Sequence, residues 1–214
     1  MNAKEGSSMS VVLSLLMGYF IGCISPAKLV SKRHDVNLKK TGTGNLGATN
    51  TALVLGKKAG YFVLVFDIFK SFFSYKLAKY LFPHLAVAGV VAGIGVILGH
   101  CFPVFLQFQG GKGLASFGGL VLAHDPLLFV ILLTLGIAMA FLMNYGVYLA
   151  ITAAGLFPIL SYFRSGSLSV LGTTAVAGGI VLAVHRSNIR RAITGEDPIH
   201  MRDGLHRIFG KKEN

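Results

Sequence analysis

Charged residues are scarce in this 214-residue chain. They make up 13% of the sequence, against about 25% in an average soluble domain, whereas 53% of the residues are hydrophobic. No polar block of domain size interrupts the apolar segments, and this excludes an ordinary soluble domain. The composition therefore predicts a single polytopic membrane protein of the all-α class.

Cysteine, tryptophan and acidic residues are also few. The two cysteines, Cys23 and Cys101, lie at the edges of apolar segments and lack a CxxC partner or metal-like spacing. We interpret both as small apolar fillers. Because tryptophan is absent, tyrosine and phenylalanine must supply any interfacial belt. The eight acidic residues form no metal-ligand pattern, so we expect neither a metal nor another cofactor.

Apolar runs long enough to cross a bilayer recur along the chain. A spanning helix needs about 20 mostly apolar residues, and this measure predicts seven membrane helices. They cover Ser10–Val30, Ala59–Leu81, Leu85–Val104, Leu114–Leu122, Pro126–Met143, Gly146–Tyr162 and Leu168–Val184. The fourth is too short to span alone and is expected to pack obliquely inside the bundle. The first lacks a convincing cleavage site, which favours a membrane helix over a removed signal peptide.

The net charge is +12, from 20 Lys and Arg against 8 Asp and Glu. In a soluble protein this excess would suggest nucleic acid, but here the basic residues lie between and after the apolar spans. They predict membrane topology and anionic substrates or lipids rather than a nucleic-acid partner. Because they gather in the first loop, the turn after the third span and the tail, those segments are expected in the cytoplasm and the N-terminus outside. Residues 1–196 are expected to form one membrane domain, and 197–214 a basic cytoplasmic tail.

The polar stretch TGTGNLGATN, Thr41–Asn50, interrupts this apolar pattern. Its glycines allow backbone amides to approach a ligand closely, and its polar side chains add hydroxyl and amide groups. The residues concerned are Gly42, Thr43, Gly44, Asn45, Gly47, Thr49 and Asn50. A helix that starts here would offer an anion site. The literal GxGxxG pattern lacks a preceding strand, so a dinucleotide fold is a weak alternative. A flexible loop between helices is the other alternative.

A second polar cluster is the turn Gly110-Gly111-Lys112-Gly113. It is too short for a P-loop, but a lysine between glycines can hold a phosphate as a point charge, with nearby amides completing the cradle. The alternative is a lysine that only fixes topology.

The third cluster, His185 to Asn188, opens a polar segment in which Ile189, Ala192 and Ile193 share one face of a short amphipathic interfacial helix. For His185, as for His100, a structural hydrogen bond is the alternative to a role in the site. Asp67 and Lys70 stand at i, i+3 inside the second span, where a mutual salt bridge is the favoured interpretation.

These clusters supply many donors and no recognisable nucleophile–base arrangement. Such a site suits direct transfer from an activated phosphate donor, with binding and electrostatics carrying most of the catalysis. A small transporter is an alternative, which the gathering of the polar groups on one side disfavours.

The motifs also carry a family resemblance. They are Gly18–Gly22 with Ser25-Pro26, Gly42–Asn50, Leu55–Gly60, Asp67–Lys70, Gly99–Phe105, Gly110–Ala115 and His185–Ile189. In this order and spacing, from about residue 11 to 196, the chain resembles the bacterial acyl-phosphate:glycerol-3-phosphate acyltransferases. The resemblance implies a seven-helix fold in the bacterial cell membrane with a cytoplasm-facing site. It also implies acyl transfer from acyl phosphate to the 1-hydroxyl of sn-glycerol 3-phosphate, giving lysophosphatidic acid and phosphate without coenzyme A.

The resemblance further implies which residues line the site. We expect loop amides and Thr43 to hold the phosphoryl group of the donor, and Lys112 to bind phosphate and stabilise developing charge. His185 and Asn188 are expected to position glycerol phosphate, while Asn45, Asn50 and the motif glycines complete the site. A phosphate oxygen of the donor would accept the hydroxyl proton.

Several positions depart from the family pattern. Thr43 replaces a serine, Leu53 an arginine and Ser187 a glutamate, and Asn144–Val147 lacks a basic residue and a serine. Arginine suits bidentate phosphate binding, and leucine offers nothing comparable. The alternative function is therefore a diverged paralogue that binds acyl phosphate but uses another acceptor or is inactive.

Overall fold

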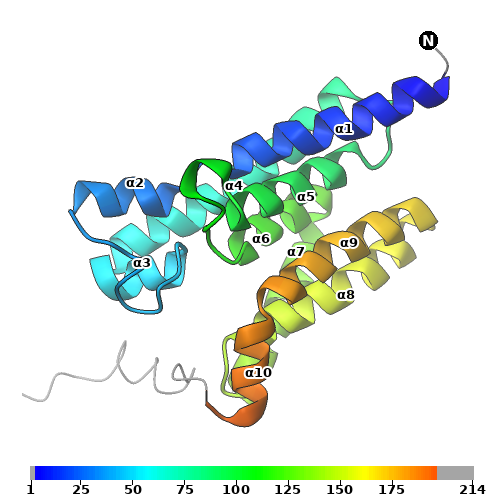
Figure 1. Ribbon diagram of the computed structural model, residues 1–214. Helices are drawn as coiled ribbons and strands as arrows, with labels where there is room; N and C mark the ends of the chain where they lie inside the picture. The colour runs from blue at the N-terminus through cyan, green and yellow to red at the C-terminus, as the bar shows by residue number, and fades with distance from the viewer. Residues whose placement is uncertain (1–2, 197–214) are drawn as a thin grey trace, which may run out of the picture.

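The computed structural model describes residues 3–196, and in that range the chain is helical without a β-strand (Figure 1). The elements in chain order are α1 (Ala3–Gly22), α2 (Pro26–Arg33), α3 (Ala48–Leu55), α4 (Lys57–Leu81), α5 (Ala88–Cys101), the 3-10 turn η1 (Val104–Leu106), α6 (Leu114–His124), α7 (Pro126–Leu142), α8 (Val147–Ser165), α9 (Leu168–Val184) and α10 (Arg186–Thr194). The all-α prediction is confirmed. The last six predicted spans coincide with α4 to α9 within three residues at each end.

The first predicted span, Ser10–Val30, lies within one candidate membrane segment, Gly6–Arg33, but it is not a single continuous helix. Instead of one helix over Ser10–Val30, α1 ends at Gly22 and α2 begins at Pro26. Proline lacks the amide that would continue the helix, and it forces the preceding Ser25 into an extended conformation. The Ser25 hydroxyl then accepts a hydrogen bond from the Lys28 amide and caps α2.

A glycine seam joins α1 to α5, which lie side by side in Figure 1. A Cβ on Gly18 or Gly22 would collide with the α5 backbone, and a Cβ on Gly95 or Gly99 would collide with the α1 backbone. Both pairs have the G-x-x-x-G spacing that lets membrane helices approach closely. The seam holds the end of α1 against the end of α5, next to the turn that carries Lys112.

Helix α1 lies at the edge of the bundle, and α4, α6 and α9 pack around α5. Short α6 packs against α4, where Gly119 meets the backbone of Ile68. The antiparallel helices α7, α8 and α9 form the second half of the bundle. Phe117 of α6 and Phe157 of α8 are fully buried where the halves meet, with their ring centroids 5.5 Å apart in an edge-to-face contact.

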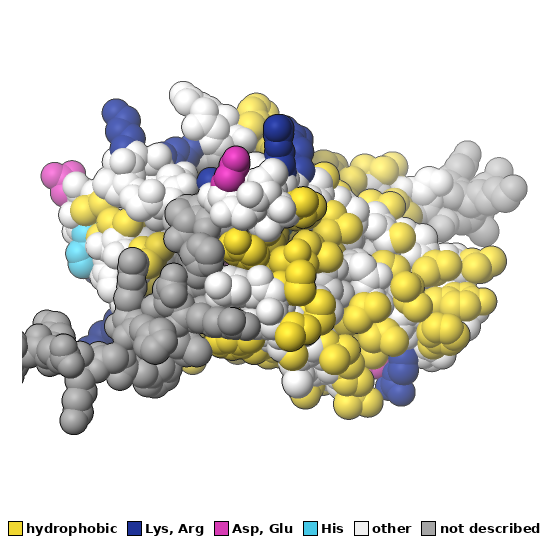
Figure 2. Space-filling model, turned by 90° about the horizontal axis from the view of Figure 1, so that it is seen from below, with side chains coloured by type: hydrophobic (Ala, Val, Ile, Leu, Met, Phe, Trp, Pro, Cys, Tyr) yellow, Lys and Arg dark blue, Asp and Glu magenta, His cyan; other side chains and the backbone are white. Residues whose placement is uncertain are grey.

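Length and composition mark three segments of residues 3–196 as candidate membrane spans: Gly6–Arg33, Ala88–Leu106 and Val147–Ser165. The bent pair α9–α10 would make a fourth, and α6 and α7 are shorter apolar helices. Helix α4 has 25 residues but carries several charged residues along its length. Figure 2 shows hydrophobic side chains spread over a wide area of one face, with Lys and Arg mainly toward its margins.

Helix α10 matches the predicted amphipathic helix and bends by 59° from α9. Ala192 is buried against the bundle, whereas Ile193 on the same side is exposed. The predicted basic tail, 197–214, lies outside the described residues.

Candidate active site

The loop between α2 and α3, residues 34–47, is anchored at both ends. Leu38 and Leu46 are 1% and 3% exposed and pack with Ala27 of α2 and Val63 of α4. Between these anchors, Thr41 to Gly44 face outward. The loop is thus tied to the helices rather than loosely connected, with its polar middle accessible.

Asn50 organises this loop from inside. Its side chain is fully buried, and Oδ1 accepts a hydrogen bond from the Thr43 amide at 2.7 Å. Its Nδ2 donates to the carbonyls of Leu38 at 2.8 Å, Asn45 at 3.0 Å and Thr41 at 3.2 Å. With these partners, the Asn50 amide holds the loop together from its buried side.

The glycines of the loop serve two different needs. Gly42 and Gly44 have φ of +61° and +71°, the left-handed region that other residues rarely adopt. Gly47 is extended and precedes α3, whose first turn has no side-chain cap. The first amides of a helix have no intrahelical partner, so the loop and the start of α3 together present backbone N–H groups. Asn45 is half-buried beside Gly47, while Thr43 and Thr49 are exposed.

The Gly110–Gly113 turn folds back on the end of α5. The Gly110 amide donates to the carbonyl of Cys101, and the Gly111 amide to that of His100, both at 3.0 Å. Gly111 lies so close to the His100 ring and the Leu46 carbonyl that a Cβ would clash with both. Gly113, with φ +75°, starts α6. Because Gly111 has no side chain, the Gly110–Gly113 turn can pack directly against the α2–α3 loop.

Two side-chain contacts join the three motifs. Lys39 Nζ donates to Gln109 Oε1 at 2.8 Å and connects the α2–α3 loop with the turn. Partial burial, and then the nearby charge of Lys28, lower the pKa of Lys39. Lys112 Nζ donates to Asn188 Oδ1 and connects the turn with α10. Gln109 was not among the predicted site residues, and nothing in its sequence context marks it.

His185 ends α9 beside this contact and is 5% exposed. Its Nδ1 lies 2.8 Å from the carbonyl oxygen of Val181. A carbonyl only accepts hydrogen bonds, so Nδ1 carries the proton. In the neutral ring, Nε2 is then the acceptor.

Below the turn, Asp67, Lys70 and His100 form a buried cluster. The predicted Asp67–Lys70 pair is present, with Oδ1 and Nζ 2.7 Å apart. His100 Nδ1 joins it, 3.1 Å from the ammonium and 3.3 Å from the carboxylate. The sequence did not predict this third partner, because His100 lies 30 residues after Lys70 and on another helix.

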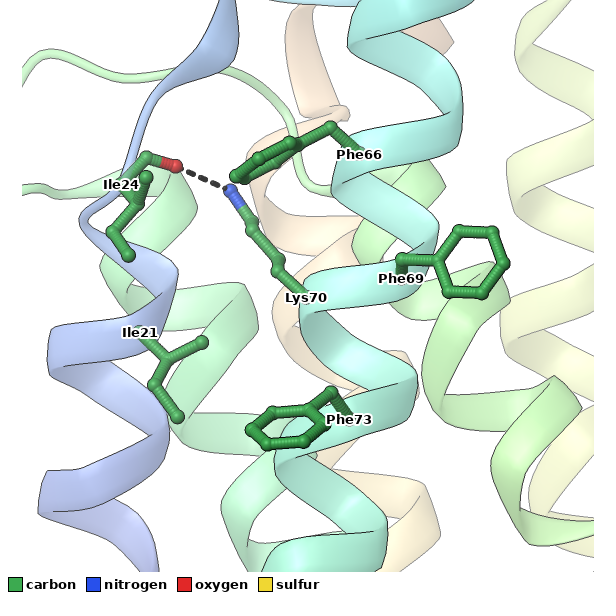
Figure 3. Close-up of a pocket in the computed structure, with 6 residues that line it drawn as sticks. All are labelled: Ile21, Ile24, Phe66, Phe69, Lys70 and Phe73. Carbon is green, nitrogen blue, oxygen red and sulfur yellow. Dashed lines mark hydrogen bonds between the residues drawn. The ribbon is translucent and has the colours of Figure 1, made fainter.

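An apolar groove opens beside Lys70 between α1 and α4, with a volume of about 440 Å³. Three phenylalanines of α4 and the isoleucines Ile21 and Ile24 line it. In Figure 3 two of the phenylalanine rings face the isoleucines and that of Phe69 projects away from them, while the lysine reaches across to the Ile24 carbonyl. The phenylalanines are Phe66, Phe69 and Phe73. Only the His100 ring stands between this lysine and Gly111, so the groove begins close to the polar site.

Within residues 3–196, no group of three or more His, Cys, Asp or Glu side chains could hold a metal ion. The joined motifs instead offer an ammonium, an imidazole acceptor and many N–H donors. The ammonium and the N–H donors bind phosphate oxygens well, and the imidazole acceptor suits a hydroxyl group.

The departures from the family pattern lie around the same region. Leu53 on α3 is 60% exposed. The hydroxyl of Ser187 donates to Asn188 Oδ1 at 3.4 Å. The 144–147 segment leads into α8, which begins at Val147 and contacts α10, and the Tyr145 hydroxyl lies near Gly195.

The fold and this site define a helical membrane protein whose polar end is built from backbone amides, a lysine and a histidine. The glycerol-3-phosphate acyltransferase family matches residues 12–195. A glycerol-3-phosphate acyltransferase of Thermoanaerobacter sp. (strain X514) is 35% identical over 190 residues, which are 88% of this chain and 95% of that protein. The enzyme of the same name from Macrococcus caseolyticus (strain JCSC5402) is 34% identical over 195 residues, 89% and 97% of the two chains.

A crystal structure of PlsY (YgiH), described as an integral membrane glycerol 3-phosphate acyltransferase in its glycerol 3-phosphate form, superposes with a TM-score of 0.84. It shares 30% identity, and the match covers 94% of this chain and 99% of that one. Its lysophosphatidic acid form matches with a TM-score of 0.80 at 30% identity, over 88% and 94% of the chains. This chain belongs to the glycerol-3-phosphate acyltransferase family and is an integral membrane acyltransferase. The resemblance inferred from the motifs is confirmed.

Proposed function

We propose that this enzyme transfers a fatty acyl group from acyl phosphate to the 1-hydroxyl of sn-glycerol 3-phosphate. The products are lysophosphatidic acid and inorganic phosphate, and the reaction serves phospholipid synthesis. The observation that carries the proposal is the contact of Lys112 with Asn188. It joins the second motif to the third, on a turn whose Gly111 already packs against the Leu46 carbonyl of the glycine loop. Membership of the family favours this enzyme over the transporter.

In the proposed site, the amides of the α2–α3 loop and Thr43 bind the phosphoryl group of the donor. Lys112 binds phosphate and stabilises the negative charge that develops as the acyl–phosphate bond breaks. Asn188 and His185 position glycerol phosphate, for which His185 Nε2 offers a hydrogen-bond acceptor, while the hydrogen of the attacking hydroxyl points to a phosphate oxygen of the donor. The apolar groove of Figure 3 is where we place the donor's hydrocarbon chain.

The chemical step needs no protein nucleophile. The glycerol oxygen bonds to the acyl carbon, the bond from that carbon to the phosphate oxygen breaks, and the hydroxyl proton leaves with the released phosphate. Holding both substrates in this geometry supplies much of the rate. The Asn50 amide contributes by shaping the loop.

We also propose that the enzyme is a multi-pass protein of the bacterial cell membrane with its active site facing the cytoplasm. The basic residues of the α2–α3 loop, the Lys112 turn and the C-terminal region support this orientation. Residues 1–196 would then be one membrane domain, followed by a basic cytoplasmic tail.

The purified enzyme in detergent tests the reaction with palmitoyl phosphate, by phosphate release with and without glycerol 3-phosphate. We expect release that depends on glycerol 3-phosphate, and a loss of about 100- to 1,000-fold on Lys112→Ala. Lys40→Ala, an exposed lysine of the neighbouring loop, is the matched control and should retain activity. Normal release by Lys112→Ala would refute the assignment of this lysine.

A second candidate, a paralogue with another acceptor, is favoured by the exposed apolar side chain of Leu53. In that case the enzyme binds palmitoyl phosphate but releases no phosphate when glycerol 3-phosphate is added.

A further inference from the structure

Asp67, Lys70 and His100 are ionisable side chains buried in the helical bundle, and they are 1%, 6% and 8% exposed. Burying charged groups is costly, and a buried ion pair is often no more stabilising than apolar residues of the same volume. Fold stability alone therefore explains the cluster poorly. Its contacts in two directions suggest what else it does.

In one direction, Lys70 completes the end of α1. Its Nζ donates to the carbonyls of Gly22 at 3.2 Å and Ile24 at 3.0 Å. In a continuous helix the Gly22 carbonyl would accept from residue 26, but Pro26 has no amide hydrogen. The ammonium supplies this missing donor at the break between α1 and α2.

In the other direction, the cluster reaches the Lys112 turn through His100. The Nδ1 side of the imidazole faces Lys70 and Asp67. The Nε2 side lies against Gly111, and the backbone carbonyl of His100 accepts the Gly111 amide at 3.0 Å. Lys112 follows Gly111 directly in the chain. A change in the orientation of the His100 ring would therefore move the backbone of Lys112 as well as that of Gly111.

We propose that Asp67, Lys70 and His100 form a positioning network that fixes the Gly110–Lys112 turn relative to the break between α1 and α2. The network holds the Lys112 ammonium where the phosphoryl group binds, and it touches no reacting atom. This inference rests on the proposed function, since Lys112 must act in the reaction for its position to matter. A misplacement of about 1 Å can cost on the order of 100-fold in rate.

Four variants test the network. Lys70→Met removes the ammonium but leaves the buried Asp67 carboxylate with His100 as its remaining partner, so it is compared with the neutral double variant Asp67→Asn/Lys70→Met. His100→Asn keeps a polar group at the Nδ1 position, whereas His100→Leu removes it. The matched control is Asp125→Asn/Arg164→Met, which removes the ion pair (2.9 Å) between the start of α7 and the end of α8.

Three measurements are made on each variant of the full chain in detergent: thermal unfolding, amide hydrogen exchange of residues 107–113, and kcat with KM for glycerol 3-phosphate. In the double variant we expect unfolding close to wild type, about tenfold faster exchange at Gly110 and Gly111, and kcat lower by about 100-fold with KM much less changed. His100→Asn should exceed His100→Leu in kcat, and the control should match wild type in exchange and kcat.

A double variant with wild-type exchange and wild-type kcat would overturn the network. Equal kcat for His100→Asn and His100→Leu would overturn the role of the Nδ1 contact. If the wild-type enzyme itself releases no phosphate in the presence of glycerol 3-phosphate, the proposed function fails. Exchange of the turn still tests the positioning network in that case.

Discussion

Replacement of Asn50 by aspartate is a sharp test of how the glycine loop keeps its shape. The change retains the oxygen that accepts from Thr43 but turns Nδ2, which donates to three carbonyls, into a second acceptor. Two hydrogens shared among three carbonyls amount to at most two full hydrogen bonds, each worth about 1 kcal/mol. Because the side chain is fully buried, the new oxygen adds unfavourable contacts with those carbonyls. We expect about 3 kcal/mol of lost loop stability, which corresponds to ~100-fold.

Amide hydrogen exchange over residues 38–45 measures this loss directly. Asn50→Asp should exchange about 100-fold faster there and lose acyltransferase activity, while the helices of the bundle keep their protection. Asn37→Ala is the matched control, because Asn37 is an exposed asparagine of the same loop whose side chain accepts a hydrogen bond from the Lys39 amide. If residues 38–45 of Asn50→Asp exchange as slowly as those of wild type, the buried amide does not hold the loop.

Three further changes have defined outcomes. Leu53→Arg places a guanidinium on an exposed site of α3 and should lower KM for glycerol 3-phosphate by about tenfold; no gain over the neutral Leu53→Gln would show that the leucine is not the defect. Gly99→Leu drives a side chain into the α1 backbone and should prevent folding or sharply lower the unfolding temperature, whereas Gly179→Leu, where a Cβ meets no atom, should not. Asp125 links pH to stability: partial burial raises its pKa, but the Leu128 amide, Arg164 and the Leu127 amide lower that pKa more. A lowered folded pKa gives stability that is present above the unfolded value of about 3.9 and is lost as pH falls through the folded value. The advantage of wild type over Asp125→Asn in unfolding temperature should therefore shrink below about pH 4, and an advantage that does not depend on pH would contradict this assignment.

The sequence predicted helix positions well because most of them depend on local composition. Apolar runs between polar turns set the bounds of α4 to α9 within three residues. The Ser25-Pro26 pair also indicates a helix break, but the apolar run Ser10–Val30 favours a prediction of one continuous helix. Because proline has no amide hydrogen and restricts the residue before it, the helix breaks before Pro26 even though the whole segment is apolar.

The site was predictable as a set of motifs and not as a set of contacts. Asn50 looked like a substrate ligand because it is polar and follows the glycines, yet its amide is used within the loop. The approach of His100 to Lys70, and of Gly111 to Leu46, depends on how α5 packs against α1 and α4. Contacts between segments this far apart arise from packing and have no local pattern.

The glycine seam between α1 and α5 has a consequence for biogenesis. About 70 residues separate Gly22 from Gly95, and at 5–20 residues per second their synthesis takes roughly 4–14 seconds. During that interval the glycine face of α1 has no α5 to pack against, and we expect lipid to cover it. Docking of α5 would then displace that lipid. Bulky substitutions along the seam should slow this late docking even where the initial insertion of α1 proceeds normally.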